Sequence, residues 1–320
     1  MPGSKTAVHP SGLKLTFTEE DHRYVDESGR EYTSVTTLLH DFFPKFDAEK
    51  AAAKKAQATG RAAEEFIREW EENSRAACEF GTRIHENCEN QMLGAFDRMH
   101  QPGDDRERKY FAIGWNTVEM LQKAFRFYAA EMIVFSPRFR IAGSIDLQML
   151  GQVSALHIFD YKTNKEIKRK AFQGQTGTQY PTRKIQNCEF EIYALQLALY
   201  ETLLKIEGYI APELPVFRSL LWFDPAAEYA RKIDLPPREL RSRREERQEE
   251  VPDGLAQPRR KVVHDELGKV AGGAPLFLDL AVARLQRGQP EVRRHTVRVV
   301  PPVHQDDDER VRLLLPRLLP

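Results

Sequence analysis

The chain has 320 residues, with 48 Lys and Arg against 48 Asp and Glu, so its formal net charge is zero. A hydrophobic fraction of 41% is ordinary for a globular protein and gives enough apolar surface for a buried core. The sequence contains no apolar run long enough for a membrane span, and residues 1–12 lack a signal-peptide pattern. Three cysteines are too few for a disulfide scaffold, so we expect a cytoplasmic protein.

The neutral total conceals two regions of different composition. Residues 1–237 contain 31 basic and 34 acidic residues, and aromatic residues are frequent there. Residues 238–320 contain 15 Arg but only 2 Lys, and Phe277 is their one aromatic residue. Two explanations stay open, namely a disordered Arg/Pro-rich tail and a frameshift near the boundary. We therefore expect a disordered N-terminus over 1–12, one functional domain over 13–237 and a low-order tail over 238–320.

Hydrophobic periodicity predicts the elements of the domain in chain order. They are a small β-hairpin within 13–36, a helix over 47–72, a helix that Ser74 caps and that runs to about Leu93, a helix over 115–130, strands within 131–150 and 154–163, a helix over 188–206 and a strand over 217–223. This order is typical of the α/β or α+β class. We expect a mixed central sheet flanked by helices.

The two central strands carry charged residues within apolar sequence. Asp160 and Lys162 lie two residues apart and therefore share a face of their strand. If Leu150 pairs with Leu156 across the hairpin, Asp146 lies opposite Asp160, and two carboxylates converge. A hard cation such as Mg²⁺ or Mn²⁺ would relieve their repulsion and activate water for attack on a phosphodiester. The alternative is a pair of strand-end acids beside a solvated lysine, but the apolar neighbours make unpaired charge expensive and favour a metal site.

The segments Gly143-Ser-Ile-Asp146 and Asp160-Tyr-Lys162-Thr163 resemble the active-site signature of the PD-(D/E)XK nuclease superfamily. Its RecB-like, Cas4-like and mitochondrial genome maintenance exonuclease-like branch is the most similar in pattern. The resemblance implies a restriction-endonuclease-like core. It also implies that Asp146 and Asp160 bind Mg²⁺ or Mn²⁺ with the Tyr161 carbonyl, and that Lys162 is catalytic.

Other short motifs resemble the same branch in the expected order. Gly81-Thr-Arg-Ile-His85 resembles the helix that supplies an additional metal ligand, here His85. Gln196 and Tyr200 match a Q-x-x-x-Y helix, which would support the lysine or contact DNA, and Glu131 heads a strand as in many members. A structural histidine and an ordinary buried Gln and Tyr remain the alternatives. The iron–sulfur members carry four cysteines, so three predict no cluster here.

A basic segment follows the catalytic-type strand. Residues 162–184 carry a net charge of +6, with Glu166 as the one acid. Cations there can neutralise phosphates, and Tyr180 can stack on an unpaired base, although a solvated loop is the alternative. The predicted DNA-binding residues are Lys165, Lys168, Arg169, Lys170, Tyr180, Arg183 and Lys184.

The resemblance implies a metal-dependent DNA exonuclease of recombination or repair in a phage or bacterial cell. Its partners would be DNA and a single-strand annealing protein, with no membrane. Two rival hypotheses remain. One is a structure-specific or restriction-type endonuclease, and the other is a non-catalytic DNA-binding protein with a nuclease fold.

Overall fold

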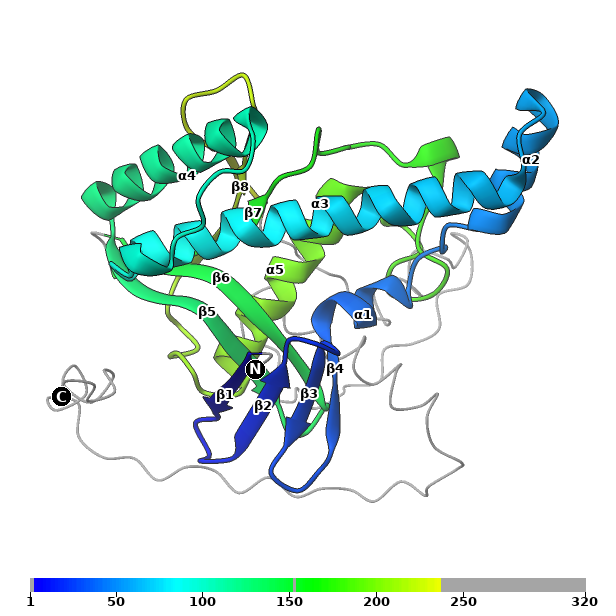
Figure 1. Cartoon of the computed structure of the whole chain (residues 1–320). Helices are drawn as coiled ribbons and strands as arrows, with labels where there is room; N and C mark the ends of the chain where they lie inside the picture. The colour runs from blue at the N-terminus through cyan, green and yellow to red at the C-terminus, as the bar shows by residue number, and fades with distance from the viewer. Residues whose placement is uncertain (1–2, 152–153, 237–320) are drawn as a thin grey trace, which may run out of the picture.

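The computed structural model describes residues 3–151 and 154–236 (Figure 1). The predicted tail over 238–320 lies outside these residues. No helix within the described ranges is both long and apolar enough to cross a bilayer. In chain order the strands and helices are β1 Ser4–Val8, β2 Lys14–Thr18, β3 Arg23–Asp26, β4 Glu31–Ser34, α1 Val35–His40, α2 Ala48–Thr59, α3 Ala63–Met92, η1 Phe96–Arg98, α4 Asp105–Ala124, β5 Arg126–Ser136, β6 Ile141–Leu150, β7 Leu156–Lys162, η2 Phe172–Gly174, α5 Glu189–Ile206, β8 Val216–Trp222 and β9 Arg231–Asp234.

The N-terminal segment forms an antiparallel meander that contains the predicted hairpin. Strands β1 to β4 pair in sequence order. The expectation of disorder over residues 1–12 is wrong for residues 4–8, because β1 pairs with β2 from Ser4 opposite Thr18 to Val8 opposite Lys14. The edge of β2 offers unpaired N–H and C=O groups, and β1 satisfies them. At the other end Ser34 caps α1 by accepting the Thr37 N–H at 3.0 Å.

Two predicted helices have different boundaries in the structure. The helix expected over 47–72 is broken at Gly60, whose φ of +75° ends α2. The start expected at Ser74 is wrong, because α3 runs unbroken from Ala63 to Met92 and Ser74 is exposed inside it. Serine favours caps but does not force them, and the Ala, Glu and Arg residues around it are good helix formers.

The helix expected over 115–130 is also displaced towards the N-terminus. Helix α4 begins after Asp104, whose carboxylate accepts the Glu107 N–H at 2.7 Å, and ends at Ala124. Strand β5 starts at Arg126, since the aromatic residues Phe125, Phe127 and Tyr128 favour extended backbone.

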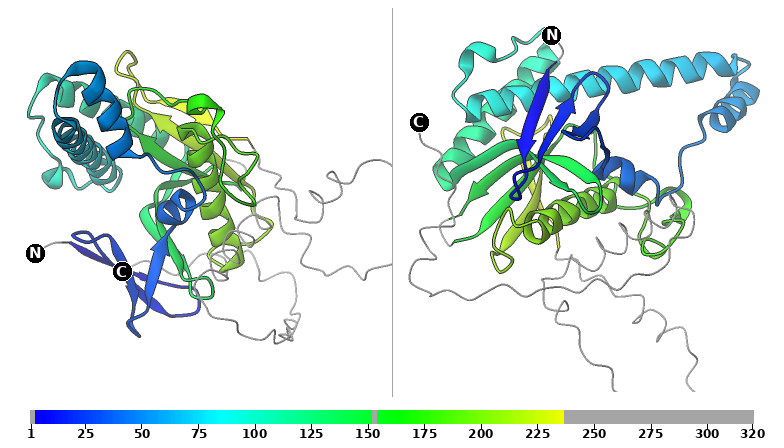
Figure 2. Two further views of the ribbon diagram at one scale, coloured as in Figure 1. Left: turned by 90° about the vertical axis from the view of Figure 1, so that its right-hand side faces the viewer. Right: turned by 90° about the horizontal axis from the view of Figure 1, so that it is seen from below.

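The sheet is mixed, as predicted, and helices cover both of its faces. Strands β5, β6 and β7 are antiparallel neighbours, β7 and β8 are parallel, and β4 is parallel to β6. Helices α1 and α5 cover one face with one core cluster, and α3 and α4 cover the other with a second cluster (Figures 1 and 2). Both the fold class and the predicted pairing of Leu150 with Leu156 are confirmed.

Strand β6 has a divided edge. Strand β5 borders one edge along the whole of β6. On the other edge, β4 pairs with Ile141 and Ala142, whereas β7 pairs with residues 147–150. Among the described residues no strand pairs with 143–146 on that edge, so β4 and β7 leave a fork there.

Candidate active site

Asp146 lies in the fork between β4 and β7. The ladder between β6 and β7 ends at Leu147 opposite Phe159, so Asp146 and Asp160 occupy the first step beyond it. The Asp146 Oδ2 atom accepts the Tyr161 N–H at 2.8 Å, in place of a strand-to-strand hydrogen bond. The carboxylate is therefore held by the main chain of β7 rather than by a flexible side chain.

Glu131 lies opposite Asp146 on the neighbouring strand. The register pairs Ala130 with Leu147 and Met132 with Ile145, which puts Glu131 level with Asp146. Glu131 has a φ of +47°, a left-handed backbone that is strained for a residue with a side chain.

The strained backbone at Glu131 reverses the alternation of side chains in β5. Ala130 packs with the α3 and α4 cluster, whereas Met132, two residues later, packs with the α5 cluster. Ser144 donates to Glu131 Oε2 at 3.0 Å and fixes the carboxylate beside the fork. The Glu131 carboxylate thus lies beside the fork, next to that of its cross-strand partner Asp146.

Helix α3 supplies His85 from above the fork. Its Nδ1 atom lies 3.4 Å from Asp146 Oδ2, and its ring centroid lies 5.5 Å from that of Tyr161. The inner part of α3 packs tightly on α4, because a Cβ at Gly114 would lie only 3.0 Å from Cys88 Sγ. A side chain at position 114 would push the two helices apart and move His85.

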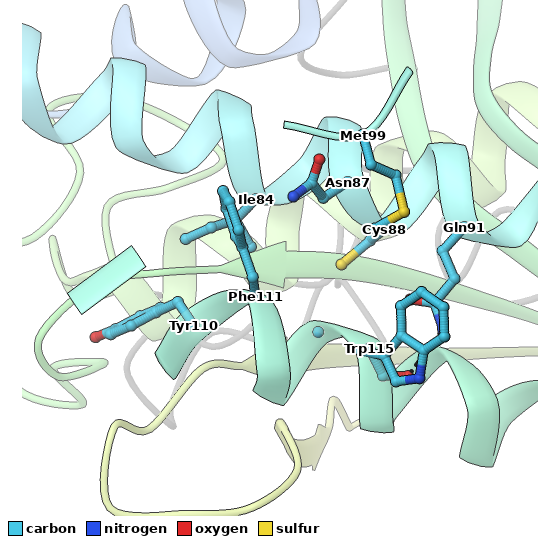
Figure 3. Close-up of a pocket in the computed structure, with 9 residues that line it drawn as sticks. Ile84, Asn87, Cys88, Gln91, Met99, Tyr110, Phe111 and Trp115 are labelled. Atoms are coloured by element: carbon cyan, nitrogen blue, oxygen red, sulfur yellow. Dashed lines mark hydrogen bonds between the residues drawn. The ribbon is translucent and has the colours of Figure 1, made fainter. Parts of the chain in front are cut away.

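A small cavity remains between α3 and α4 (Figure 3). Ile84, Asn87 and Cys88 line it from α3, and Tyr110 and Trp115 line it from α4. Its volume of about 10 Å³ has room for a single water molecule. The cavity is a packing gap and not a ligand site.

Lys162 and Asp160 form a largely buried ion pair at the end of β7. Their side chains are 15% and 4% exposed. The Lys162 ammonium also lies 4.4 Å from the centroid of the Tyr193 ring. Gln196 Nε2 donates to Asp160 Oδ1 at 3.4 Å and to the Tyr200 hydroxyl at 3.2 Å. Gln196 and Tyr200 therefore share one face of α5, as predicted, and orient the acid of the pair.

Tyr200 also explains the glycine of the Gly-Ser-Ile-Asp motif. A Cβ at Gly143 would lie 2.6 Å from Tyr200 Cε1, so any side chain there would collide with the ring. In the same motif Ser144 binds Glu131, Ile145 is buried in the core and Asp146 enters the fork.

Burial and neighbouring negative charge raise the pKa of two acids of the site. Burial and then the charge of Asp160 raise the pKa of Asp146 to about 7. Burial and then Asp146 raise the pKa of Glu131 to about 7. Burial lowers the pKa of His85. Burial also opposes the charged form of Lys162, but the fields of Asp160 and Asp146 outweigh it and the pKa of Lys162 is raised.

The donor set fits a divalent cation. Ligand atoms of His85, Glu131 and Asp146 all lie within 4.8 Å of one another. Crowded carboxylates whose anionic forms repel each other are stabilised by a hard cation, which prefers oxygen ligands. The triad differs from the predicted ligand set, because Glu131 belongs to it whereas Asp160 is engaged by Lys162 and Gln196.

Two residues near the site were missed in the sequence. Ser144 stands inside the quoted motif and binds Glu131. Tyr193 lies three residues before Gln196, which places both on one helical face of α5. Their spacing from motif residues is the signal that would have found them.

The predicted DNA-binding residues lie in a segment that leaves the site after Lys162. Lys165, Lys168, Arg169, Lys170, Arg183 and Lys184 are exposed, and Tyr180 is half-buried. Hydrogen bonds fasten the segment to residues 41–44, since Thr182 Oγ1 donates to the Phe42 carbonyl at 3.1 Å and Asn187 Nδ2 donates to the Pro44 carbonyl at 3.3 Å. The segment that carries these cations therefore starts at the site and is held in place by residues 41–44.

Comparison with protein families assigns this chain to a family. Residues 17–274 match the family model described as the PD-(D/E)XK nuclease superfamily, which covers more than half of the chain. No curated protein matches. The matched range includes the fork, the Lys162 pair and the basic segment.

Proposed function

This chain belongs to the PD-(D/E)XK nuclease superfamily, and on that premise we propose that it is a metal-dependent DNA exonuclease of recombination or repair. Nuclease activity, divalent metal dependence and a DNA substrate follow from the family. The observation that carries the proposal is the convergence of Asp146, Glu131 and His85 beside the Asp160–Lys162 pair.

We assign the metal to Asp146, with His85 and Glu131 beside it and with Asp160 and the Tyr161 carbonyl as the remaining predicted ligands. When bound, a divalent ion polarises a phosphoryl oxygen and lowers the pKa of a water molecule. The remaining catalytic role belongs to a side chain of the protein. Lys162 orients the attacking water and offsets the negative charge that develops on the phosphate.

The surrounding residues keep these groups in place. Gln196 fixes the Asp160 carboxylate, and the Tyr193 ring lies against the Lys162 ammonium. The Tyr161 N–H fixes Asp146. Such support matters because a catalytic group that is displaced by about 1 Å loses much of its effect.

The exposed cations of residues 165–184 support a path for the DNA backbone. Six exposed Lys and Arg side chains belong to an anchored segment that begins at the end of β7. Neutralising phosphates there would supply affinity without reading sequence. The exonuclease assignment and a single-strand annealing partner are supported by the resemblance of the motifs to the exonuclease branch.

The test compares linear duplex DNA with a circular single-stranded DNA of similar length, in Mg²⁺ and in Mn²⁺. We expect the linear DNA to be degraded and the circle to survive, and chelation by EDTA to stop the reaction. Lys162→Ala and Asp160→Ala should abolish activity. Asp234→Asn, which changes an exposed carboxylate of β9, is the matched control and should retain activity.

Other outcomes would replace the proposal. Cutting of the circle at the rate of the linear fragment would make the protein an endonuclease. DNA binding without cleavage in the folded wild type, equal to that of Lys162→Ala, would make it a binding protein. Circular dichroism of each variant separates lost chemistry from lost folding.

A further inference from the structure

The outer end of α3 carries an exposed aromatic cluster far from the fork. Phe46 is 74% exposed, and its ring lies 5.6 Å from that of Trp70 in an edge-to-face arrangement. Phe66 lies beneath Trp70 at 6.3 Å between centroids. Figures 1 and 2 show this end of α3 projecting past the sheet, with α2 folded back beside it.

Two cations lie against the rings of the cluster, and one of them, Arg61, is itself paired with the Glu65 and Glu69 carboxylates of α3. Lys55 Nζ lies 5.2 Å from the Trp70 ring, and the Arg61 guanidinium lies 4.4 Å from the Phe66 ring. Helix α2 contributes Lys50, Lys54 and Lys55, all exposed, against Glu49 alone. An open aromatic ring beside positive charge is the arrangement that holds an unpaired base and its phosphates.

The opposite end of α3 shows that an exposed ring is not enough. Phe96 is 57% exposed and lies 5.9 Å from Trp115, much as Phe46 lies on Trp70. There, however, the Trp115 indole N–H donates to the Glu119 carboxylate at 3.0 Å. The two pairs thus have similar rings, but an ammonium lies over Trp70 whereas a carboxylate binds Trp115, and the first arrangement is the better one for a phosphate backbone.

The basic segment extends towards the same end of the molecule. It carries Phe172, which is 73% exposed, and it is hydrogen-bonded to residues 41–44, directly before Phe46 in the chain. Thr163, which follows Lys162 at the start of the segment, lies against α3 at Gly81, where a Cβ would be 3.3 Å from Thr163 Oγ1. The basic segment therefore connects the Lys162 pair with the neighbourhood of the aromatic cluster.

The geometry of α3 gives the separation between the two places. Trp70 and His85 are fifteen residues apart, which is about 22 Å along the axis and about 60° around it. The acids of the intervening turns, Glu71, Glu72 and Glu79, point at least about 100° away from Trp70. Between Trp70 and His85, α3 itself therefore directs no carboxylate to the side that Trp70 occupies.

We propose that Phe46 and Trp70 form a stacking site for unpaired bases of single-stranded DNA, separate from the metal-binding fork. The proposal rests on the proposed nuclease function and narrows its substrate. A strand stacked at about 3.4 Å per nucleotide needs about seven nucleotides to reach from Trp70 to the fork. The substrate is thus a single-stranded end at least that long.

The test measures binding of fluorescein-labelled (dT)₂₀ to the full chain in EDTA, by fluorescence anisotropy. Phe46→Ala should weaken binding about 5- to 100-fold, since stacking on one ring contributes that much per base. Phe46→Trp should preserve binding. Phe46→Leu should behave like Phe46→Ala, because leucine is apolar but has no ring face. Phe96→Ala is the matched control and should bind as the wild type does.

Two further readouts test stacking itself. Binding of (dT)₂₀ should quench tryptophan fluorescence, and Trp70→Phe should remove the quench while leaving affinity nearly intact. A blunt duplex, whose bases are stacked internally, should bind Phe46→Ala and the wild type equally.

Several results would overturn the stacking site. Equal affinity of Phe46→Ala and the wild type for (dT)₂₀ would refute it, even if linear DNA is degraded normally. Normal binding by Phe46→Leu would indicate an apolar protein contact instead. So would a wild-type dimer that Phe46→Ala converts to a monomer in light scattering. Absence of cleavage in the wild type concerns the nuclease proposal and leaves these binding measurements to stand on their own.

Discussion

The two halves of α3 are built differently. The inner half buries Phe80, Ile84, Cys88 and Met92 against α4 and the sheet, whereas residues 71–79 are exposed on every side of the helix. The inner half therefore fixes His85 in space, and the outer half offers surface. Substitutions in the inner half should change catalysis and stability, whereas substitutions over residues 71–79 should change neither.

The largest expected effect lies where the inner half meets the fork. Asp146→Asn should lower kcat at least about 1,000-fold, because the proposed metal contributes several kcal/mol through this carboxylate. His85→Ala should lower it about 10- to 100-fold by weakening the same site. Initial rates on linear DNA measure both. Full activity of His85→Ala would show that α3 contributes no residue to the active site.

The second largest expected effect is a difference between the two halves of α3 in how much a substitution lowers the free energy of unfolding. Ile84→Ala removes a fully buried side chain and should cost about 2–5 kcal/mol of unfolding free energy. Arg75→Ala, in the exposed half, should change it by no more than about 0.5 kcal/mol. Urea unfolding followed by circular dichroism gives both values. A similar cost for both would mean that the outer half is covered in solution.

The basic segment should behave like the outer half of α3. Arg169→Ala combined with Lys170→Ala should leave kcat nearly unchanged but weaken DNA binding. The slope of log Kd against log salt should become shallower by about 1.5, which corresponds to two lost phosphate contacts. Lys14→Ala combined with Arg23→Ala, two exposed cations of the N-terminal meander, is the matched control. An equal change in the control would indicate nonspecific attraction.

The smallest expected effect is at Ser74. In an unbroken helix Ser74→Ala should stabilise the protein by about 0.5 kcal/mol, because alanine is the better helix former. If Ser74 capped a separate helix, the same change would cost about 1 kcal/mol. Thermal denaturation distinguishes the sign. A loss of stability would mean that α3 is divided at this point.

The sequence predicts the parts of the site that depend on local rules. The two-residue period of a strand places Asp160 with Lys162, and the Leu150–Leu156 pairing follows from the hairpin. In a helix, residues four apart lie on the same face, so Gln196 lies beside Tyr200. These relations can be predicted because they depend only on residues that are close together in the sequence.

The parts that it does not predict depend on distant contacts. The left-handed backbone of Glu131 follows from no residue preference, and neither does the convergence of Glu131 with His85 and Asp146. The pairing of β1 depends on the open edge of β2, and the continuity of α3 through Ser74 overrides a capping preference. Tertiary structure decides each of these cases.

The divided edge of β6 also has a consequence for the order of folding. Strand β4 needs a partner that is synthesised about 100 residues later, since Thr33 pairs with Ile141. Gly143 is covered only when Tyr200 of α5 has been made. Closing such a long loop lowers the conformational entropy of the chain before any stabilising contact has formed. Strand pairings between distant residues therefore form slowly. A nascent chain therefore carries its N-terminal meander well before the carboxylates of the fork can come together.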